Sequence, residues 1–216
     1  MDAEKFWNIC SANNIILDPE QMKMFNSFHD NLKEQNQKVN LISRKDEGNI
    51  WSNHILHSLT ILKYTDICLK ANCLDIGTGG GLPGIPLKIA RNDINMTMAD
   101  SIAKKIKITE ELADDTGLKH LTAIRTRVED ISKDNKYDII VARAVSKLDK
   151  ILSWSKKLAK RNTKWALLKG GDLSEEIAIA KEKFPKLYIT EKLLELKDYN
   201  YFADEDKKII LCEYKK

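Results

Sequence analysis

A dense glycine loop follows an apolar run and an acid in the segment from Cys73 to Pro86. Five glycines fall within residues 77–84, directly after the tripeptide Leu74-Asp75-Ile76. Glycine tolerates positive φ angles and lets a ligand approach the backbone closely. A strand that ends in such a loop and continues into a helix presents amide N–H groups to a nucleotide. The segment therefore predicts a nucleotide-binding turn of the Rossmann type.

Two ligand patterns overlap in this loop. Residues 79–84 fit GxGxxG, which is typical of dinucleotide-binding enzymes, and residues 77–81 fit GxGxG, which resembles motif I of S-adenosylmethionine-dependent methyltransferases. Asp75 favours the methyltransferase, because its carboxylate can receive the ammonium group of the methionine part but would repel a pyrophosphate. Pro83 and Pro86 also fit a dinucleotide turn poorly, since proline has no N–H donor. An NAD(P)-dependent oxidoreductase remains the alternative.

Further candidate contacts follow the next three strands. Asp100 can accept hydrogen bonds from both ribose hydroxyls of an adenosine-containing cofactor, and it could equally cap the helix that follows. Val128 would give apolar contact beside the adenine ring, where backbone oxygens or Glu129 would accept the exocyclic amine. Arg143 leaves the fourth strand and is expected to point into the crevice at the carboxyl ends of the strands.

Strands and helices alternate from about residue 71. Apolar strands are expected at 72–76, 95–99, 121–125, 137–142 and 164–168. Amphipathic helices are expected at 85–91, 101–116, 147–160 and 173–183. This alternation predicts an α/β fold with a parallel sheet and helices on both faces. Two further strands, 187–196 and 208–214, would close a mostly parallel seven-stranded sheet, which resembles the Rossmann-like class I methyltransferase fold.

Residues 1–64 show a helical pattern without the alternating strands of the later part of the chain. Residues 1–64 predict an N-terminal helical extension, and residues 65–216 the methyltransferase domain. Asp18-Pro19 predicts the start of a helix, since proline is favoured at the first helical position. A second helical stretch carries apolar residues from Trp51 to Leu62, after a short non-helical link at 39–43.

Composition and charge narrow the class of protein. The 216 residues are 43% hydrophobic and 31% charged, as in a soluble globular protein. No apolar run approaches the roughly 20 residues of a membrane span, and the four cysteines show no metal-site spacing. We expect a cytoplasmic monomer that holds no metal and contacts no membrane.

Positive charge is concentrated in one part of the sequence. The net charge is +4, yet residues 101–170 carry 17 Lys and Arg against 9 Asp and Glu. The segment 156–164 has five bases and no acid. Such a cluster favours nucleic-acid binding, and Lys157, Lys160 and Arg161 are its candidate phosphate contacts. A solvated lysine face would give the same pattern.

Most of the chain resembles one known family, the bacterial small-subunit ribosomal RNA guanine methyltransferases, also called glucose-inhibited division protein B. The run Gly-Leu-Pro-Gly-Ile-Pro at 81–86 carries most of this resemblance. Further matching segments are Val39-Asn40-Leu41-Ile42, Asp100-Ser101, Arg127-Val128-Glu129, Ala142-Arg143-Ala144 and Leu167-Leu168-Lys169-Gly170. One departure is His57, which stands where the family usually has an aspartate.

The resemblance implies a function and a set of contacts. The family transfers a methyl group from S-adenosylmethionine to nitrogen 7 of a guanine in 16S ribosomal RNA. The substrate would be that RNA or the small ribosomal subunit. By the same resemblance, the cofactor contacts are Gly77, Leu82, Val128, Glu129 and Arg143. Gly79 and Asp100 complete the expected cofactor site.

This chemistry predicts few catalytic groups. The lone pair of guanine nitrogen 7 is unprotonated at neutral pH, so no general base is needed and we assign no catalytic residue. Arg143 or Lys169 could stabilise the guanine oxygen 6 by hydrogen bonding. Besides the oxidoreductase, a ribosome-assembly module that binds RNA without catalysis is an alternative. Binding of S-adenosylmethionine against NAD would separate these functions.

Overall fold

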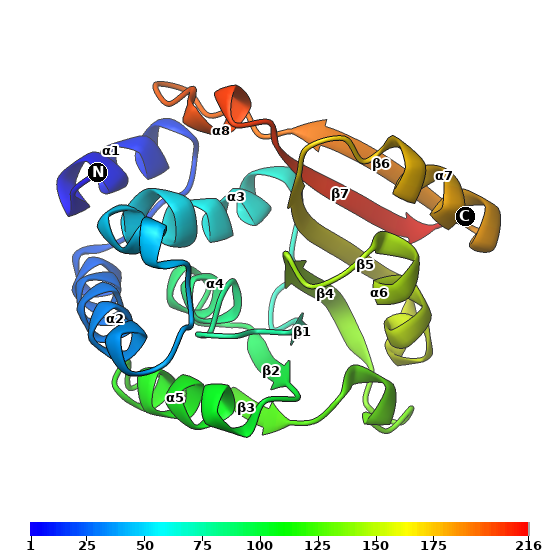
Figure 1. Cartoon of the computed structure of the whole chain (residues 1–216), viewed down its shortest axis with the longest axis horizontal. Helices are drawn as coiled ribbons and strands as arrows, with labels where there is room; N and C mark the ends of the chain where they lie inside the picture. The colour runs from blue at the N-terminus through cyan, green and yellow to red at the C-terminus, as the bar shows by residue number, and fades with distance from the viewer. Residues whose placement is uncertain (216) are drawn as a thin grey trace.

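The computed structural model describes residues 1–215 and contains one seven-stranded sheet (Figure 1). The strands lie in the order β3-β2-β1-β4-β5-β7-β6. Their bounds are β1 Asn72–Ile76, β2 Asn95–Asp100, β3 Leu121–Arg125, β4 Tyr137–Arg143, β5 Ala159–Gly170, β6 Leu187–Leu193 and β7 Lys207–Tyr214. Strands β1 to β5 pair in parallel, and β7 lies antiparallel between β5 and β6. The predicted class I methyltransferase sheet is confirmed.

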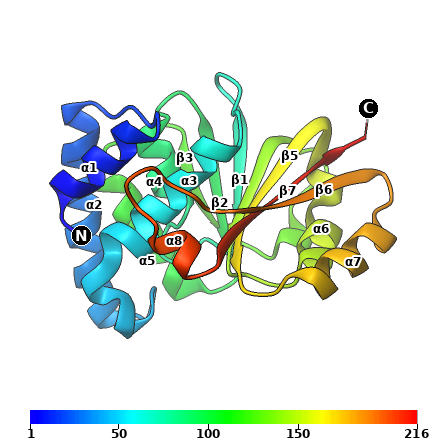
Figure 2. The same ribbon diagram turned by 90° about the horizontal axis from the view of Figure 1, so that it is seen from above.

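Helices cover both sides of this sheet (Figures 1 and 2). The longer helices are α1 Ala3–Ala12, α2 Pro19–Lys38, α3 His57–Tyr64, α4 Gly84–Ala90, α5 Ala103–Asp114, α6 Leu148–Ser155 and α7 Ser174–Lys183. The shorter ones are η1 Arg44–Asn49, η2 Ile50–Leu56, η3 Val128–Asp130, η4 Lys156–Leu158 and α8 Tyr201–Asp204. Helices α1 to α5 share one apolar cluster with one face of the sheet, and α6 and α7 share a second cluster with the other. None of the helices in residues 1–215 is long and apolar enough to cross a membrane.

The helical extension packs into the same core as the sheet. Phe6, Phe25 and Ile55 from the extension belong to the cluster that also contains Met98 of β2 and Ile209 of β7. Burial of these side chains removes apolar surface from water, which stabilises the fold by about 25 cal/mol for each Å² buried. The boundary at residue 64 therefore stays a prediction from sequence pattern, since the apolar core is continuous across it.

Local hydrogen bonds set the start of α2 and the non-helical link that follows it. Asp18 caps α2, because its carboxylate accepts from the Gln21 N–H while the Gln21 side chain accepts from the Asp18 N–H. After α2, the buried Asn36 holds the non-helical link, since its Oδ1 accepts from the N–H groups of Leu41 and Ile42. This bond places Leu41 against the glycine loop, 3.1 Å from where a Cβ of Gly80 would stand.

Three expected elements differ from the structure. Helix α6 ends at Ser155 rather than 160, because Ala159 already pairs with Tyr137 and starts a longer β5. A bulge follows in β5, where the Lys160 N–H donates to the Thr163 hydroxyl. Strand β6 ends at Leu193, three residues early, and the expected loop from 197 to 207 contains helix α8.

Candidate cofactor and substrate site

Two adjoining cavities open at the carboxyl ends of the parallel strands. The first encloses about 490 Å³ and lies over β1, β2 and η3, whereas the second encloses about 480 Å³ and lies between the glycine loop, the extension and α8. Both volumes are typical of small-molecule sites. The cavities share Gly77, Lys105 and Ala144 in their linings, so they form one continuous crevice.

The glycine loop forms the floor where the cavities meet. Gly77, Gly79 and Gly81 have φ angles of +63°, +60° and +80°, which side chains rarely adopt. A Cβ on Gly77 would stand 2.8 Å from Cγ2 of Val145, a residue that lines the first cavity. A methyl group on Gly77 would therefore collide with the Val145 side chain. Leu82 is buried and lines the second cavity.

Asp75 braces the loop from beneath. Its side chain has no exposed surface, and its Oδ2 accepts from the Thr78 hydroxyl at 2.6 Å and the Gly84 N–H at 2.9 Å. Burial raises the pKa of Asp75 to about 7, although hydrogen bonds from Thr78 and Gly84 oppose the shift. Asp75 lines neither cavity. Its Oδ2 thus fixes the loop, whereas its buried Oδ1 has no hydrogen-bond partner among residues 1–215, and receipt of the methionine ammonium by Asp75 stays a prediction.

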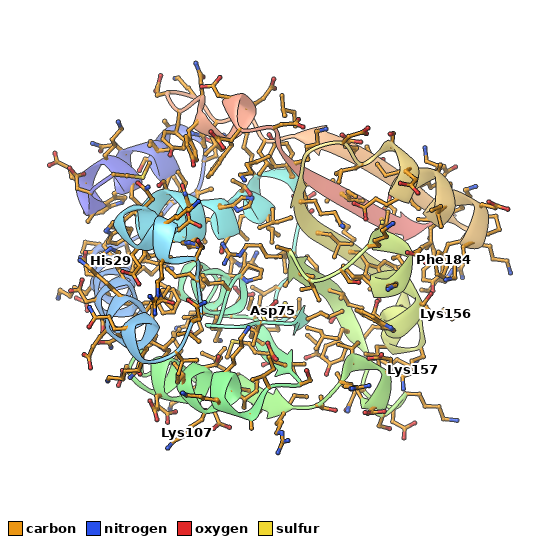
Figure 3. The ribbon with its side chains drawn as sticks, viewed as in Figure 1. His29, Asp75, Lys107, Lys156, Lys157 and Phe184 are labelled. Carbon is orange, nitrogen blue, oxygen red and sulfur yellow. The ribbon has the colours of Figure 1, made fainter. Side chains whose placement is uncertain are left out.

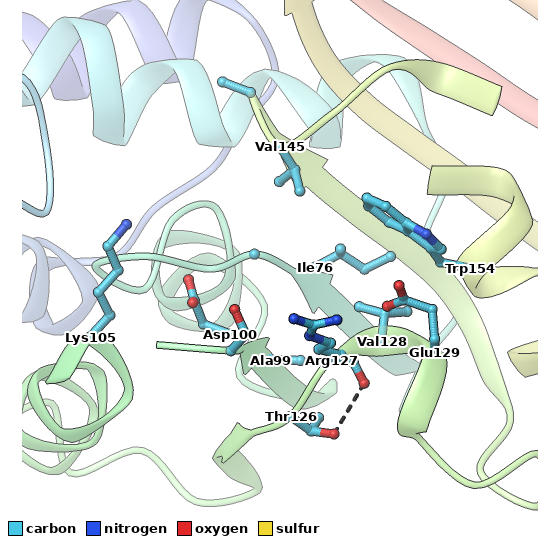
Figure 4. A pocket seen from close by; sticks show the side chains of 13 residues that line it. Ile76, Ala99, Asp100, Lys105, Thr126, Arg127, Val128, Glu129, Val145 and Trp154 are labelled. Atoms are coloured by element: carbon cyan, nitrogen blue, oxygen red, sulfur yellow. Dashed lines mark hydrogen bonds between the residues drawn. The ribbon is translucent and has the colours of Figure 1, made fainter. Parts of the chain in front are cut away.

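Asp100 connects the second strand to the same loop. Its Oδ2 accepts from the Gly79 N–H at 3.1 Å, and its Oδ1 accepts from the Ile102 N–H at 2.9 Å. The first bond holds the loop, and the second closes the turn before α5, whose N-cap residue is Ile102; the contact with ribose hydroxyls stays a prediction. Asp100 also lines the first cavity, where its side chain faces the interior (Figure 4).

The far end of the first cavity suits an adenine ring. Figure 4 shows Asp100 and Lys105 at one end of the cavity and Val128, Glu129 and Trp154 at the other. Val128 is buried, and the indole of Trp154 adds a flat apolar wall that adenine could stack on. The sequence pointed to Val128 and Glu129, whereas Trp154 was missed because it occupies an ordinary position of an amphipathic helix.

Arg143 lies in the second cavity and not in the first. Its Nη1 donates to the Asn53 carbonyl oxygen at 3.1 Å and to Nδ1 of His54 at 2.5 Å. Burial lowers the pKa of Arg143 to about 10, and Asp75 and Asp46 oppose the shift. The guanidinium therefore remains charged at neutral pH, in the cavity that the glycine loop also lines.

Two buried histidines of the extension surround this arginine. Because Nδ1 of His54 accepts from Arg143, the ring proton lies on Nε2, which is 3.8 Å from the Asp46 carboxylate. Burial and the charge of Arg143 lower the pKa of His54 to about 3, and they hold the pKa of His57 well below its usual range. His57, at the position of the family aspartate, packs against the ring of Phe202 at 5.2 Å. Arg143 thus lies near two neutral imidazoles, and one of them, His57, occupies the position of the family aspartate.

Acidification is expected to destabilise the protein through His54. The unfolded chain takes up a proton at the ordinary histidine pKa of 6.5, whereas the folded protein keeps the ring neutral until about pH 3. The unfolded state binds more protons in this window. The unfolding free energy therefore decreases by about 1.4 kcal/mol for each unit by which the pH is lowered. His54→Gln should remove this part of the slope in urea unfolding between about pH 6 and pH 4.5.

The matched control is His120→Gln, at an exposed histidine. This variant should keep the wild-type slope. Equal slopes for His54→Gln and the wild type would contradict a neutral, buried His54.

The remaining candidate RNA contacts lie outside the crevice. Lys169 is ion-paired with Glu176 at 2.7 Å and donates to the Ser146 carbonyl oxygen, so it is turned toward α7. Lys160 pairs with Asp138 near the start of β4, which is the opposite edge of the sheet from Arg143.

The basic segment 156–164 contributes no residue to the lining of either cavity. Figure 3 shows Lys156 and Lys157 at the rim of the molecule and Asp75 near its centre. Lys157 donates to the Glu129 carbonyl oxygen, while Arg161 is exposed at the bulge of β5. Phosphate contact by Lys157, Lys160 and Arg161 stays a prediction; Lys157 lies next to the Glu129 end of the first cavity, whereas Lys160 lies near the start of β4.

Solved structures with a similar fold include several methyltransferases. The ribosomal protein L11 methylase of Lactobacillus delbrueckii subsp. bulgaricus matches with a TM-score of 0.58 and 15% identity, over 74% of this chain and 78% of that one. An S-adenosylmethionine-dependent methyltransferase from Aquifex aeolicus matches with a TM-score of 0.53 and 18% identity, over 72% of this chain and 87% of that one. Sheet order and glycine loop together define a class I S-adenosylmethionine-dependent methyltransferase.

Sequence comparison identifies the family within this class. The sequence model described as rRNA small subunit methyltransferase G, GidB, matches residues 21–201. A ribosomal RNA small subunit methyltransferase G from Christiangramia forsetii is 40% identical over 189 residues, which is 85% of each chain. One from Cytophaga hutchinsonii is 40% identical over 167 residues, covering 74% of this chain and 80% of its own. The chain belongs to the GidB family, and the resemblance read from its motifs is confirmed.

Proposed function

We propose that this chain methylates small-subunit ribosomal RNA, at nitrogen 7 of a guanine in 16S RNA, with S-adenosylmethionine as methyl donor. The observation that carries the proposal is the continuous crevice. Its first cavity has the glycine loop, the Asp100 carboxylate and the apolar end that suit an adenosine. Its second cavity has cations and aromatic side chains that suit a nucleotide. Family membership supports the same reaction.

The residues that would hold the cofactor are Gly77, Gly79, Leu82, Asp100, Val128 and Glu129. When bound, S-adenosylmethionine supplies an electrophilic methyl group. Asp100 accepts from ribose hydroxyls, while Val128 and Trp154 enclose the adenine and exclude water. The glycine backbone of the loop permits close approach of the methionine part. These contacts act by alignment, which can supply about 7–11 kcal/mol in favourable intramolecular cases.

Arg143 has two uses in this arrangement. Its charge lies where the glycine loop meets the second cavity, so it can contact the methionine end of the cofactor, as the family resemblance implies. It can also donate to oxygen 6 of a guanine, which is adjacent to nitrogen 7 on the same edge of the base. Lys169 is less suited to that second role, because Glu176 and Ser146 already occupy its ammonium group.

The proposed substrate has consequences for partners and location. The chain would act on 16S RNA or the small ribosomal subunit in the cytoplasm, as a monomer. An exposed, unpaired guanine is required, because A-form helices hide the nitrogen 7 edge in a deep, narrow groove. Recognition of the surrounding RNA would then depend on shape and phosphate charge.

The test compares 16S RNA from cells with and without the protein. Borohydride–aniline cleavage, which detects 7-methylguanine, should give one band that disappears when the protein is absent. The wild-type chain should restore this band, and a folded Arg143→Ala variant should restore less of it. Identical cleavage patterns with and without the protein would overturn the proposal. Calorimetry that shows binding of NAD and not of S-adenosylhomocysteine would instead favour the alternative function, an NAD(P)-dependent oxidoreductase.

A further inference from the structure

We propose that helix α8 and the residues around it form the receptor for the target guanine. Tyr201 would stack on the base, Glu205 would accept from its Watson–Crick edge, and Lys207 with Arg143 would face its oxygen 6. This inference rests on the proposed function and names the part of the crevice that the base enters. No glycine loop marks Tyr201 and Glu205, which lie in the connection between β6 and β7, and Lys207 is the first residue of β7.

The connection is placed directly over the second cavity. Helix α8 lies between the helical extension and β7 in Figure 1. Tyr201, Phe202, Glu205 and Lys207 all line the second cavity, opposite the glycine loop. Since that cavity joins the first one at Gly77, a base held there would lie next to the methionine end of the cofactor site.

The Tyr201 ring is held by an aromatic cluster. Its centroid lies 5.8 Å from that of Tyr199 and 5.9 Å from that of Phe202, and Phe202 in turn packs on His57. Phe202 is fully buried, whereas Tyr201 is only partly buried. The cluster thus fixes a partly buried tyrosine that also lines the second cavity. Aromatic side chains in such positions are the usual stacking platforms for unpaired bases.

The polar groups of the wall match guanine in particular. Guanine presents acceptors, nitrogen 7 and oxygen 6, on one edge, and its amino group is a donor on another. The exposed carboxylate of Glu205 is an acceptor for such a donor, and the cations Lys207 and Arg143 are donors for oxygen 6. Adenine would meet the cations with its own amino donor, so the same wall would reject it.

The experiment measures methyl transfer from tritiated S-adenosylmethionine to unmethylated small ribosomal subunits. Tyr201→Ala should lower kcat/KM about 10- to 100-fold through lost stacking, whereas Tyr201→Phe should keep it within about threefold. Glu205→Ala should lower kcat/KM about tenfold, through the lost acceptor for the base. Asp204→Ala is the matched control, because Asp204 is an exposed acid of the same helix that does not line the cavity.

Two further measurements separate base recognition from folding and from the function itself. Affinity for S-adenosylhomocysteine and the thermal midpoint should stay at wild-type values in Tyr201→Phe, Glu205→Ala and Asp204→Ala. Wild-type rates in both Tyr201→Ala and Glu205→Ala would overturn the base receptor and leave the proposed function intact. A wild-type protein that binds the cofactor but transfers no methyl group to small subunits would overturn both.

Discussion

Gly77→Ala is expected to lower the affinity for S-adenosylhomocysteine by about 10- to 100-fold, the range that corresponds to overpacking a tightly filled site. The φ angle of Gly77 is +63°, and the added methyl carbon would meet Cγ2 of Val145 at 2.8 Å and Cγ1 at 3.0 Å. Val145 lines the first cavity, so it cannot yield without narrowing the space for the cofactor. Titration calorimetry with S-adenosylhomocysteine measures the loss.

The matched control is Gly117→Ala. Gly117 has nearly the same φ angle, +66°, yet nothing lies within 4 Å of the methyl group that it would gain. Both variants therefore carry the backbone cost of about 1–2 kcal/mol for a left-handed residue, and only Gly77→Ala carries the contact with Val145. Equal affinities in the two variants would show that Gly77 is not part of the cofactor site.

Asp100→Ala is expected to weaken cofactor binding by about 1–3 kcal/mol, or roughly 5- to 150-fold. The substitution removes the acceptor proposed for the ribose hydroxyls and frees the Gly79 N–H, so the loop loses its attachment to β2. It also removes the acceptor for the Ile102 N–H, and the thermal midpoint should therefore fall. Calorimetry and thermal unfolding of the same preparations measure the two effects separately.

Asp172→Ala isolates the contribution of this turn bond to stability. Asp172 accepts from the Ser174 N–H at 2.9 Å, the same two-residue geometry as Asp100 and Ile102, but it stands at the start of α7. This control should lose stability without losing affinity. If Asp100→Ala behaves in the same way, Asp100 only closes the turn before α5 and the ribose contact is wrong.

Strand positions were predictable from short apolar runs, including that of β3, which is only partly buried at the edge of the sheet. Strands β1 and β3 agree with the expected bounds residue for residue, and β2 and β4 each run one residue further. The β5 bulge and the early end of α6 were not predictable, because they depend on pairing of Ala159 with Tyr137, more than 20 residues away. Helix α8 is a single short turn without a periodic pattern, and so gives no sequence signal of its own.

The residues of the site likewise fall into those that the sequence could predict and those that depend on tertiary packing. Asp100, Val128 and Glu129 follow strands whose carboxyl ends meet in any such sheet, so their gathering in one cavity could be expected from spacing. The second cavity could not be expected, because the link after α2, the η2 helix and α8 supply its walls and meet only through tertiary packing. Asp75 was placed correctly on its strand, but its complete burial depends on Thr78 and Gly84 folding over it.

The apolar core that the extension shares with the sheet sets an order for biosynthesis. Phe6, Phe25 and Ile55 leave the ribosome well before the strands that cover them, and Ile209 of β7 follows Ile55 by 154 residues. Chains grow at about 5–20 residues per second, so the nascent extension has incomplete packing for roughly ten seconds or more. Until β7 pairs with β5, the apolar face of the extension lacks part of the surface that buries it in the finished fold.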